Sequence, residues 1–309
     1  MANQMTQKYL QGEIIAPDKD GWASFANTLI MISNVNSLKV DGSGGLINGY
    51  GSAWWKCKSC QRPSILNFSS CKSLNVINLN LINSPKSHIH IHGCSDATFT
   101  GLNISSPETS PNTDGFDISY SQNVLIENSI IATGDDCVAI SGGSSHVNVT
   151  GISCGPGHGI SIGSLGKKYD TVENVYVSNI NFTRTTNGVR IKTIQNGVGY
   201  AKQITFQDIT FEETRFPIII DQHYTSYDDS LGNGRSVEVS GITYRDFKGT
   251  SADGRAIYLN CADSGCFDLT LDDINLVSNY PGKPATCFCN NAHGTVTSTT
   301  PNCSGLLTA

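Results

Sequence analysis

Charge and long apolar stretches are scarce in this sequence of 309 residues. Only 15% of the residues are charged, and 20 basic side chains stand against 26 acidic ones, which gives a net charge of −6. This balance argues against nucleic acid as a partner, although a local basic patch can still bind an anionic substrate. Because no apolar run is long enough to cross a bilayer, we expect no membrane segment. The first residues, MANQMTQKYLQGE, also lack the apolar core of a signal peptide.

Cysteine spacing of the kind that binds zinc is also missing, although the sequence contains 11 cysteines. Cys57 and Cys60 form a C-x-x-C pair, but no second pair follows at a zinc-like spacing. Disulfides in a secreted protein explain the count better, and the odd number leaves at least one thiol free or paired outside this chain. N-x-S/T sequons agree with secretion, and they begin at Asn67, Asn103, Asn148, Asn181 and Asn302.

What the sequence does contain is a repeat. The pattern apolar-x-apolar-x-x-apolar-x-apolar occurs eight times, with starts about 23 to 33 residues apart. The starts are Leu74, Ala97, Val124, Val147, Val175, Ile204, Val237 and Leu269. Short alternating segments lie between these starts, and their expected inward pairs are Ile89/Ile91, Phe116/Ile118, Val138/Ile140, Ile160/Ile162, Val189/Ile191, Ile218/Ile220 and Ile257/Leu259.

Alternation of β-branched residues between Gly, Asn and Ser turns indicates strands. Several short strands per repeat predict an all-β fold, namely one coil of a parallel β-helix for each repeat. A propeller needs about 40 residues per blade, and a β-sandwich gives no reason for the repeat. We expect a single domain over residues 1–309, with a weaker coil at LKVDGSGGLING and a capping tail over residues 280–309 that carries Cys287, Cys289 and Cys303.

The second set of strands predicts a column of polar side chains. Two positions before the first inward residue, successive coils carry Asp114, Asp136, His158 and Asn187. Equivalent positions in a parallel stack lie about 4.8 Å apart, so these side chains should line up, with Asp135 beside them. Outward positions on later strands carry Arg190, Lys192 and Tyr258.

Stacked carboxylates cannot all ionise easily, so at least one pKa should be raised. One protonated acid beside ionised ones is the equipment for glycoside hydrolysis, in which the acid protonates the leaving oxygen and the others activate a water. Arg190 and Lys192 would bind a carboxylate on the sugar. The sequence therefore points to an enzyme acting on an acidic polysaccharide.

Four segments carry a resemblance to a known family: SPNTDGFDI at 110–118, TGDDCVAI at 133–140, CGPGHGISIGSLG at 154–166 and VRIKT at 189–193. From about Gly12 onward the chain resembles the plant polygalacturonases of glycoside hydrolase family 28. The resemblance implies a right-handed, single-stranded parallel β-helix. It also implies an inverting, metal-independent hydrolase of α-1,4-linked galacturonan that needs no cofactor and acts in the cell wall. The protein is expected to work as a monomer.

The resemblance also implies roles for single residues. Asp135 matches the general acid, Asp114 and Asp136 match the pair that activates the water, and His158 matches the supporting histidine. Substrate-binding positions are Asn112, Arg190, Lys192 and, more weakly, Tyr258. Disulfides Cys137–Cys154 and Cys261–Cys266 follow from the same comparison. Family members have roughly one more coil and a cap before the segment where this chain begins, so the N-terminal coil is expected to be incomplete.

Simpler explanations remain open for several residues. His88, His90 and His92 alternate as H-I-H-I-H and are expected to face outward together, either as a metal site or, as we favour, beside the substrate with His90 contacting sugar. Asp117 and Asp221 are expected to be structural or peripheral. Two other functions remain: a truncated, non-catalytic pectin-binding relative and, less favoured, a calcium-dependent pectate lyase. An acidic pH optimum is expected, because Asp135 must stay protonated while its neighbours ionise.

Overall fold

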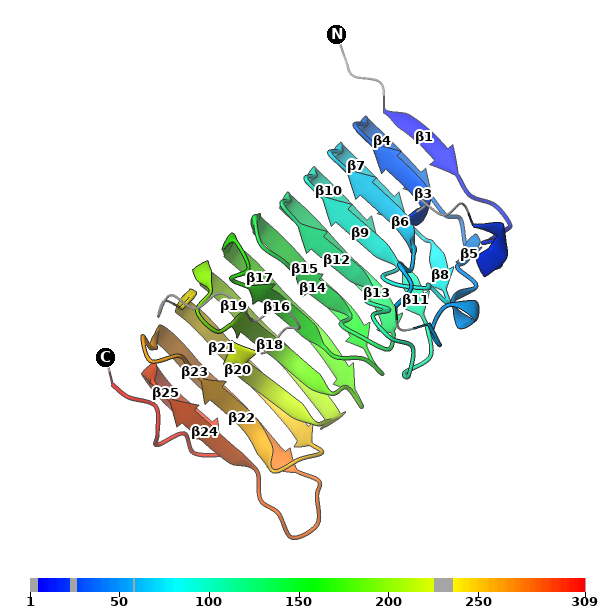
Figure 1. The fold of residues 1–309 in the computed structure, drawn as a ribbon. Helices are drawn as coiled ribbons and strands as arrows, with labels where there is room; N and C mark the ends of the chain where they lie inside the picture. Colours follow the sequence, from blue (N-terminus) through cyan, green and yellow to red (C-terminus); the bar gives the residue numbers. More distant parts are fainter. Residues whose placement is uncertain (1–4, 23–26, 58, 225–235, 309) are drawn as a thin grey trace.

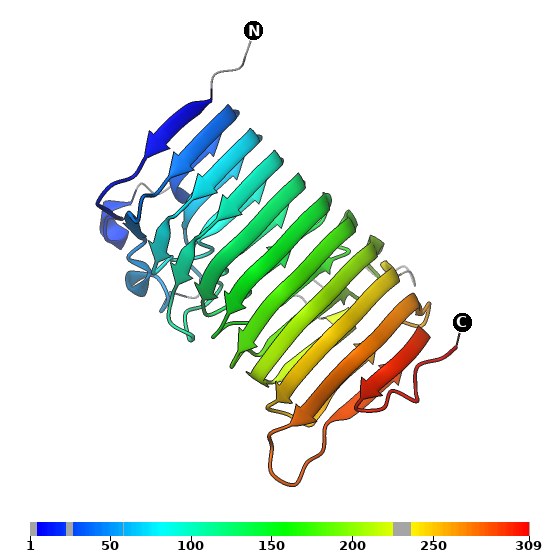
Figure 2. The same cartoon turned by 180° about the vertical axis from the view of Figure 1, so that it is seen from behind.

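The computed structural model describes residues 5–22, 27–57, 59–224 and 236–308. Strands lie side by side along one axis, and the two chain ends lie at opposite ends of the stack (Figures 1 and 2). In these ranges the only helical segments are two short 3-10 turns, η1 (Lys19–Gly21) and η2 (Gly51–Ala53). No helix among the described residues could cross a membrane.

Two sheets of parallel strands make up the described part of the chain. The main path of the larger sheet contains β1 (Thr6–Tyr9), β4 (Asn36–Asp41), β7 (Lys72–Ile77), β10 (Ser95–Thr100), β13 (Gln122–Ala132), β15 (Ser144–Cys154), β17 (Tyr169–Thr183), β19 (Val198–Thr214), β21 (Glu238–Ser251), β23 (Cys266–Ser278) and β25 (Ala292–Thr300). Four short strands join its N-terminal half: β2 (Glu13–Ile15), β5 (Leu46–Asn48), β8 (Asn80–Ile82) and β11 (Asn103–Ser105).

The smaller sheet has one strand from each coil. In order along the stack it contains β3 (Thr28–Ser33), β6 (Ser64–Ser69), β9 (Ile89–His92), β12 (Phe116–Ser119), β14 (Val138–Ile140), β16 (Ile160–Leu165), β18 (Asn187–Ile194), β20 (Phe216–Tyr224), β22 (Arg255–Asn260) and β24 (Thr286–Asn290). Because each circuit of the chain adds a parallel strand to both sheets, the predicted parallel β-helix is confirmed. The weaker coil predicted before residue 74 is formed by β4 and β5.

The core lies between the two sheets, where the predicted inward pairs stack. Phe116 pairs in register with Ile89 on one side and Val138 on the other, and the row continues through Ile160 and Val189. All five side chains are fully buried. Removing a large apolar side chain of this kind from water contributes about 1.5–3 kcal/mol, so these rows fix the register of every strand in the smaller sheet.

The x-x step of the repeat is a backbone kink. One residue of the step adopts a left-handed conformation, with φ of 50° at Asn128, 53° at Asn179 and 53° at Asp208. Asn and Asp tolerate this region better than other non-glycine residues. The kink turns the strand while keeping the apolar residues on both sides of it in the core, which is why the pattern breaks strict alternation.

One predicted repeat is out of register. Val237 was expected to be equivalent to Ile204, but the strands pair Ile204 with Ile242 and Phe206 with Tyr244. Val237 and Val239 are also buried and precede a second kink at Gly241, where φ is 64°. The apolar pattern of the repeat therefore also fits around the kink at Gly241. As a result, the repeat was predicted to start at residue 237, five positions before its true start at residue 242.

Residues 280–309 include the last strand of each sheet, β24 and β25, and a disulfide between Cys287 and Cys303. We propose that residues 1–309 form one domain whose last coil, closed by this disulfide, caps the C-terminal end. Burying the final apolar row in this way is what a solenoid end requires.

Candidate active site

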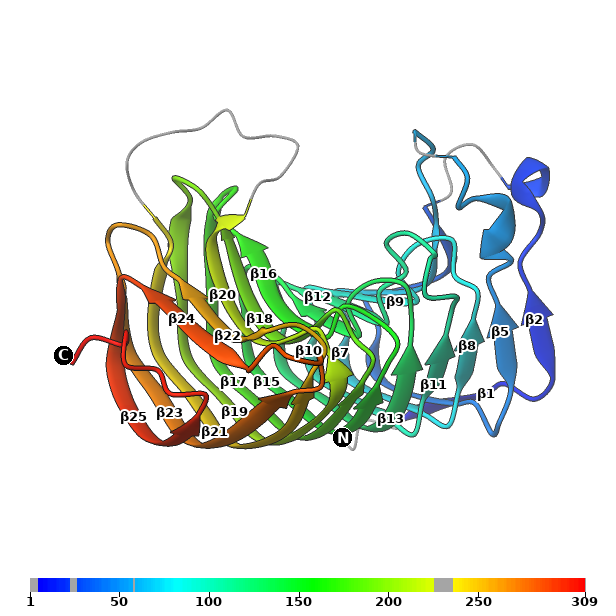
Figure 3. The ribbon, with the colours of Figure 1, turned by 90° about the horizontal axis from the view of Figure 1, so that it is seen from below.

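The outer face of the smaller sheet presents one continuous row of side chains. Residues paired in register follow one another from coil to coil. This outward row consists of Asn67, His90, Asp117, Ala139, Ser161, Arg190, Ile219, Tyr258 and Phe288. It lies on the side of the coil where loops rise from both edges of the sheet (Figure 3). The predicted site residues belong to this row or to the loops that lead into its strands.

Two of these loops are tied together before their strands begin. The Thr113 hydroxyl accepts a hydrogen bond of 3.0 Å from the Gly134 N–H and hydrogen-bonds the Ser110 hydroxyl. The loop before β12, which carries Asn112 and Asp114, is thereby fixed against the loop before β14, which carries Asp135 and Asp136. Thr113 is fully buried, so these hydrogen bonds are shielded from water.

Asp136 is surrounded by donors. One carboxylate oxygen, Oδ1, accepts from Arg190 Nη2 and from the Ser161 hydroxyl, both at 2.8 Å. The other, Oδ2, accepts from Lys192 Nζ at 2.9 Å. The Asp136 side chain is only 2% exposed. A carboxylate removed from water in this way is stable in its charged form only because two cations compensate it.

Asp135 has a different set of partners. Its Oδ1 lies 2.9 Å from Nδ1 of His158 and also accepts from the Asp136 N–H at 2.9 Å. Its Oδ2 accepts from the Asn112 side-chain amide at 3.3 Å. The backbone N–H of His158 donates to the Asp135 carbonyl at 2.8 Å, so this histidine is held to Asp135 by both its backbone and its ring.

The predicted column is therefore correct in its members but not in their contacts. The alignment stacks His158 on Asp136, whereas the structure places His158 against Asp135. Strand register applies only where strands are paired, and the three acids and His158 all precede their strands. Asn187, the last member of the predicted column, is the first residue of β18, and its side-chain amide donates to the His158 carbonyl at 3.1 Å. At this point the chain turns through Gly159, whose φ of 86° and close approach to the Asn187 carbonyl leave no room for a side chain.

Asp114 is half-buried beside the other acids. Burial raises its pKa well above the usual value, and the negative charges of Asp117, Asp135 and Asp136 raise it further, while Lys192 lowers it. The expected raised pKa in a stack of carboxylates is thus found at Asp114. Burial likewise raises the pKa of Asp117, against the hydrogen bond from Ser87 and the charge of Lys86.

The expectation of a protonated Asp135 does not hold in the free protein. Burial raises the pKa of this carboxyl, but the hydrogen bond and charge of His158, together with Lys192, outweigh that effect and lower it overall. The physical reason is the short contact with the imidazole, which the sequence alignment assigned to Asp136. Any proton that Asp135 delivers therefore belongs to the Asp135–His158 pair and not to Asp135 alone.

The three alternating histidines do not face outward together. His90 and His92 do, and Nδ1 of His90 lies 3.2 Å from the Asn67 side-chain amide. His88 is fully buried instead, with Nδ1 2.9 Å from the Asp114 carbonyl and Nε2 2.9 Å from the Ser106 hydroxyl. Burial lowers the pKa of His88 to about 4, so it is a neutral support for the loop that carries Asp114.

Tyr258 lies on the outward row two coils beyond Arg190. Its ring stacks on Phe288, with centroids 5.1 Å apart and planes 18° apart. Phe288 is 46% exposed, so the C-terminal end of the row is an exposed aromatic surface. Apolar rings of this kind can support a sugar ring, but the pair lies away from the carboxylates.

Ser161 and Arg62 contact the predicted site residues and were missed by sequence reasoning, while Asp117 was expected only to be structural or peripheral. Ser161 and Asp117 occupy outward positions between inward apolar residues, so the alternation itself could have found them. Arg62 gives no such signal, because it lies in the loop before β6. Its guanidinium nevertheless donates to Oδ1 of Asn112 and to the carbonyl oxygens of Pro85 and Pro111.

Disulfides hold the loops around the site. The implied bridges Cys137–Cys154 and Cys261–Cys266 are both present. Cys57–Cys60, the C-x-x-C pair, is a third bridge. Cys137 directly follows Asp136, and Cys154 is on the strand that leads to the loop of His158. The site is therefore cross-linked within its own coil.

The acidic cluster offers an incomplete set of metal ligands. Donor atoms of Asp135, Asp136 and His158 lie within 4.8 Å of one another. However, Asp136 is paired with Arg190 and Lys192, and Nδ1 of His158 faces Asp135. A cation would have to displace these contacts in a place where two cationic side chains already lie, so the donor set does not fit a divalent ion.

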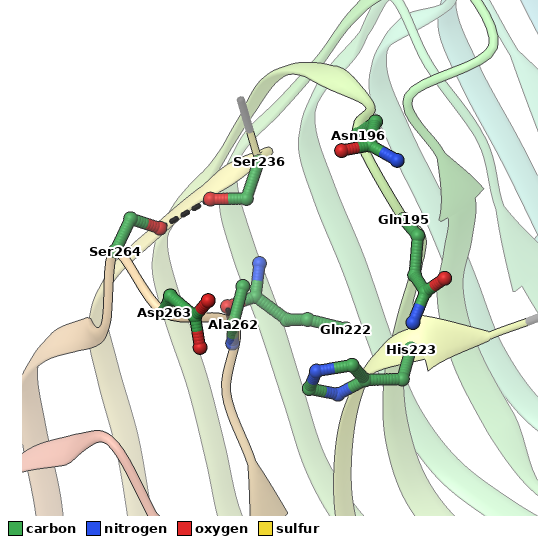
Figure 4. Close-up of a pocket in the computed structure, with 8 residues that line it drawn as sticks. All are labelled: Gln195, Asn196, Gln222, His223, Ser236, Ala262, Asp263 and Ser264. Carbon is green, nitrogen blue, oxygen red and sulfur yellow. Dashed lines mark hydrogen bonds between the residues drawn. The ribbon is translucent and has the colours of Figure 1, made fainter. Parts of the chain in front are cut away.

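A separate hollow of about 300 Å³ lies at the C-terminal ends of β18 and β20. Figure 4 shows the polar side chains around it, among them Gln195, His223 and Asp263. His223 is joined to the outer face of the sheet by a 3.0 Å hydrogen bond with Asn260. None of the residues predicted for catalysis lines this hollow.

The fold is a parallel β-helix with a cluster of acids on the outer face of its smaller sheet, and sequence comparison places the chain in a family. The profile of "Glycosyl hydrolases family 28" matches residues 4–302. The chain belongs to this family.

Similar proteins include several plant enzymes. A probable polygalacturonase of Arabidopsis thaliana is 44% identical over 94% of this chain and 65% of its own length. A polygalacturonase of Persea americana is 40% identical over 91% of this chain and 62% of its own length. The chain thus spans slightly less than two thirds of each of these curated relatives.

Solved structures agree on the fold. An endo-xylogalacturonan hydrolase from Aspergillus tubingensis has a TM-score of 0.80 and 28% identity, covering 93% of this chain and 85% of its own. A polygalacturonase from Erwinia carotovora has a TM-score of 0.76 and 24% identity, covering 92% of this chain and 81% of its own. Both similarities extend over nearly the whole stack.

Proposed function

We propose that this protein hydrolyses α-1,4-galacturonosyl linkages in homogalacturonan by direct attack of water, with inversion. The observation that carries the proposal is the site itself. Three carboxylates lie together in three different environments: one paired with two cations, one paired with a histidine, and one with a raised pKa. Acids whose environments differ in this way can divide acid and base roles between them. Membership of the family and the polygalacturonase relatives supply the substrate class.

In the proposed reaction, Asp135 passes the proton shared with His158 to the glycosidic oxygen as the C–O bond breaks. Asp114 and Asp136 bind the attacking water and remove its proton as the oxygen bonds to C1. The raised pKa of Asp114 suits it to this task, because once ionised it is the stronger base. The single hydrogen bond from Asn112 leaves Oδ2 of Asp135 open toward the substrate.

Arg190 and Lys192 would have two roles, namely to neutralise Asp136 and to bind the substrate. Arg190 uses Nη2 on Asp136 and Nε on Ser161, so other N–H groups of its guanidinium remain for a ligand. Lys192 uses one contact on Asp136 and lies 5.5 Å from the Tyr224 ring. We propose that the remaining donors bind a galacturonate carboxylate next to the scissile bond, while Tyr258 and His90 contact sugars further along the row.

We further propose that the protein acts outside the cell, as a monomer, on wall pectin. Four disulfides among the described residues are consistent with an oxidising compartment.

The test is reducing-end release from polygalacturonate at about pH 5, with a chelator present, for the wild type and Asp135→Asn. The wild type should be active, and the variant should lose activity by about 10²–10⁴-fold while keeping its melting temperature. The rate should fall as the pH rises above neutral, because the Asp135–His158 pair must hold a proton. Inversion is read from the anomer first formed, by NMR.

Other outcomes identify other functions. An unsaturated product that disappears with chelator would identify a calcium-dependent lyase. Tight binding of polygalacturonate without any product, by a folded wild type, would identify a non-catalytic pectin-binding protein. Because one similar structure is an endo-xylogalacturonan hydrolase, xylogalacturonan is included as a second substrate; a higher rate on it would correct the proposed substrate.

A further inference from the structure

Arg62 connects three loops at the N-terminal side of the site. It lies between the Cys57–Cys60 disulfide and β6, on a coil that carries none of the residues assigned to catalysis. Its Nη1 donates to the carbonyl oxygen of Pro85 at 3.3 Å and to that of Pro111, and its Nη2 donates to Oδ1 of Asn112. The guanidinium is therefore fixed by groups on two neighbouring loops.

These contacts decide which way the Asn112 amide faces. A guanidinium can only donate, so the atom of Asn112 that meets Arg62 must be its carbonyl oxygen. The NH₂ group of the amide then faces Asp135 and donates to Oδ2 at 3.3 Å. Without Arg62 the amide could turn over when Asp135 is protonated, because its oxygen could then accept the carboxyl proton.

The charge of Arg62 also acts on Asp135. Asn112 bridges the two groups, with its oxygen on Arg62 and its NH₂ on Asp135. In agreement with this geometry, the negative charge of Asp135 acts to raise the pKa of the guanidinium, against the larger effect of burial, which lowers it. An arginine in this place remains a cation. It therefore favours the ionised form of Asp135, alongside His158 on the other carboxylate oxygen.

We propose that Arg62 is a positioning residue for the acid. It holds Asn112 so that a donor, and not an acceptor, faces Asp135. When the Asp135 carboxyl carries its proton on Oδ2, that proton then has no acceptor on Asn112 and is left for the glycosidic oxygen, while Oδ1 keeps its contact with His158. This inference rests on the proposed function, because it gives Arg62 a role only through Asp135.

A purely structural role is the alternative, since Arg62 also joins the loops of Pro85 and Pro111. The two roles predict different results. Loss of a structural clamp lowers the melting temperature and leaves the folded enzyme's turnover and pH dependence alone. Loss of a positioning residue lowers kcat with little change in KM and moves the pH dependence, because the acid itself has changed.

The experiment compares Arg62→Gln, Arg62→Lys and wild type, with Arg245→Gln as a matched control. Arg245 pairs with Asp272 on the larger sheet, away from the site. Arg62→Gln should lower kcat about 10- to 100-fold with KM changed less than about twofold. In the pH profile of kcat, the fall in rate on the alkaline side should move to higher pH, because removal of a nearby cation raises the pKa of Asp135.

Arg62→Lys keeps the positive charge but loses the planar set of N–H donors that fixes the Asn112 amide. The alkaline side of its kcat–pH profile should therefore stay near that of the wild type, while kcat itself remains lowered. In an Asn112→Ala background, Arg62→Gln should have little further effect on kcat, because the group that Arg62 positions is gone. Arg245→Gln should resemble wild type throughout.

Unchanged kcat and pH profile in Arg62→Gln, or effects that simply add to those of Asn112→Ala, would overturn the proposal. A carboxyl ¹³C NMR titration of Asp135 in wild type and Arg62→Gln decides the electrostatic part without any activity. It should show a higher pKa in the variant, and equal values would refute it. A folded but inactive wild type would instead refute the proposed function.

Discussion

Asp114 and Asp136 occupy equivalent places on neighbouring coils, yet their surroundings are opposite. The Asp136 carboxylate is buried with three donors, two of them cations. Asp114 has acidic neighbours, and their charges add to the effect of burial in raising its pKa. The backbone places the two carboxyls side by side, since the Gly115 N–H donates to the Asp136 carbonyl at 2.9 Å.

The difference shows how a repeating backbone produces a site that does not repeat. The coil supplies spacing and direction, so acids on successive coils come together. The next coil then supplies Ser161 on β16, and the coil after it supplies Arg190 and Lys192 on β18, whose salt bridges are both to Asp136. Three substitutions probe this contrast and a fourth tests the aromatic end of the same row; they are described from the largest expected effect to the smallest.

Asp136→Asn should have the largest effect. It leaves Arg190 and Lys192 facing each other without their shared anion in a poorly hydrated place. Breaking a buried ion pair by removing one partner costs about 3–5 kcal/mol, so the free energy of unfolding should fall by roughly that amount. Urea unfolding measures it. A matched change at Asp272, whose ion pair with Arg245 is exposed, should cost less than about 1 kcal/mol. Equal losses would contradict the contrast.

Asp114→Asn should act in the opposite direction. A carboxyl with a raised pKa binds its proton more tightly in the folded protein than in the unfolded chain. Its contribution to stability therefore falls as the pH rises from the ordinary pKa of 3.8 toward the raised pKa of the folded state. The neutral amide removes this cost. At pH about 7 the variant should be more stable by on the order of 1 kcal/mol, and the gain should disappear at pH about 3. Thermal melts across pH test this, and a gain that does not vary with pH would contradict it. Activity should be lost.

Asp117→Asn should sharpen the contrast by removing one acidic neighbour. Of the charges that raise the pKa of Asp114, that of Asp117 is the largest. The pKa of Asp114 should therefore fall in the variant, and the acidic limb of the rate should move to lower pH if ionised Asp114 is required. A carboxyl NMR titration follows Asp114 directly. Asp272→Asn is the control, and a limb that stays in place would argue against the coupling.

Phe288→Ala should have the smallest effect. The variant removes one ring from the exposed aromatic end of the row, and if a sugar packs there the lost contact of about 0.5–1.5 kcal/mol raises the KM for polygalacturonate a few-fold with kcat unchanged. Phe267→Ala is a close control, because Phe267 is similarly exposed, at 44%, and stacks on His293 away from the outward row. Equal KM changes in both variants would remove the aromatic end of the row from the binding surface.

The strands and the members of the site could be predicted from the sequence because both follow from periodicity. Inward pairs such as Ile160/Ile162 are fixed by burial, and residues that precede equivalent strands must lie near one another. Contacts within the site could not be predicted the same way. His158 meets Asp135 and not Asp136 because the turn at Gly159 lies outside the register.

Two further errors have equally local causes. Val237 was misplaced because two kinks in one coil offer the same apolar pattern in two positions. His88 was misplaced because alternation was extended one residue before β9 begins, where the side chain turns into the protein. Arg62 could not have been found at all, since nothing in a loop two coils away indicates where its guanidinium will reach.

The Cys137–Cys154 bridge has a consequence for how the acid and its histidine stay together. Asp135 lies two residues before one end of the bridge, and His158 lies four residues after the other end. If the strands of this coil separate briefly, the disulfide still links the two side chains through only a few residues on each side. Their effective concentration toward each other then remains in the millimolar range or above, so the pair can form again without the rest of the site.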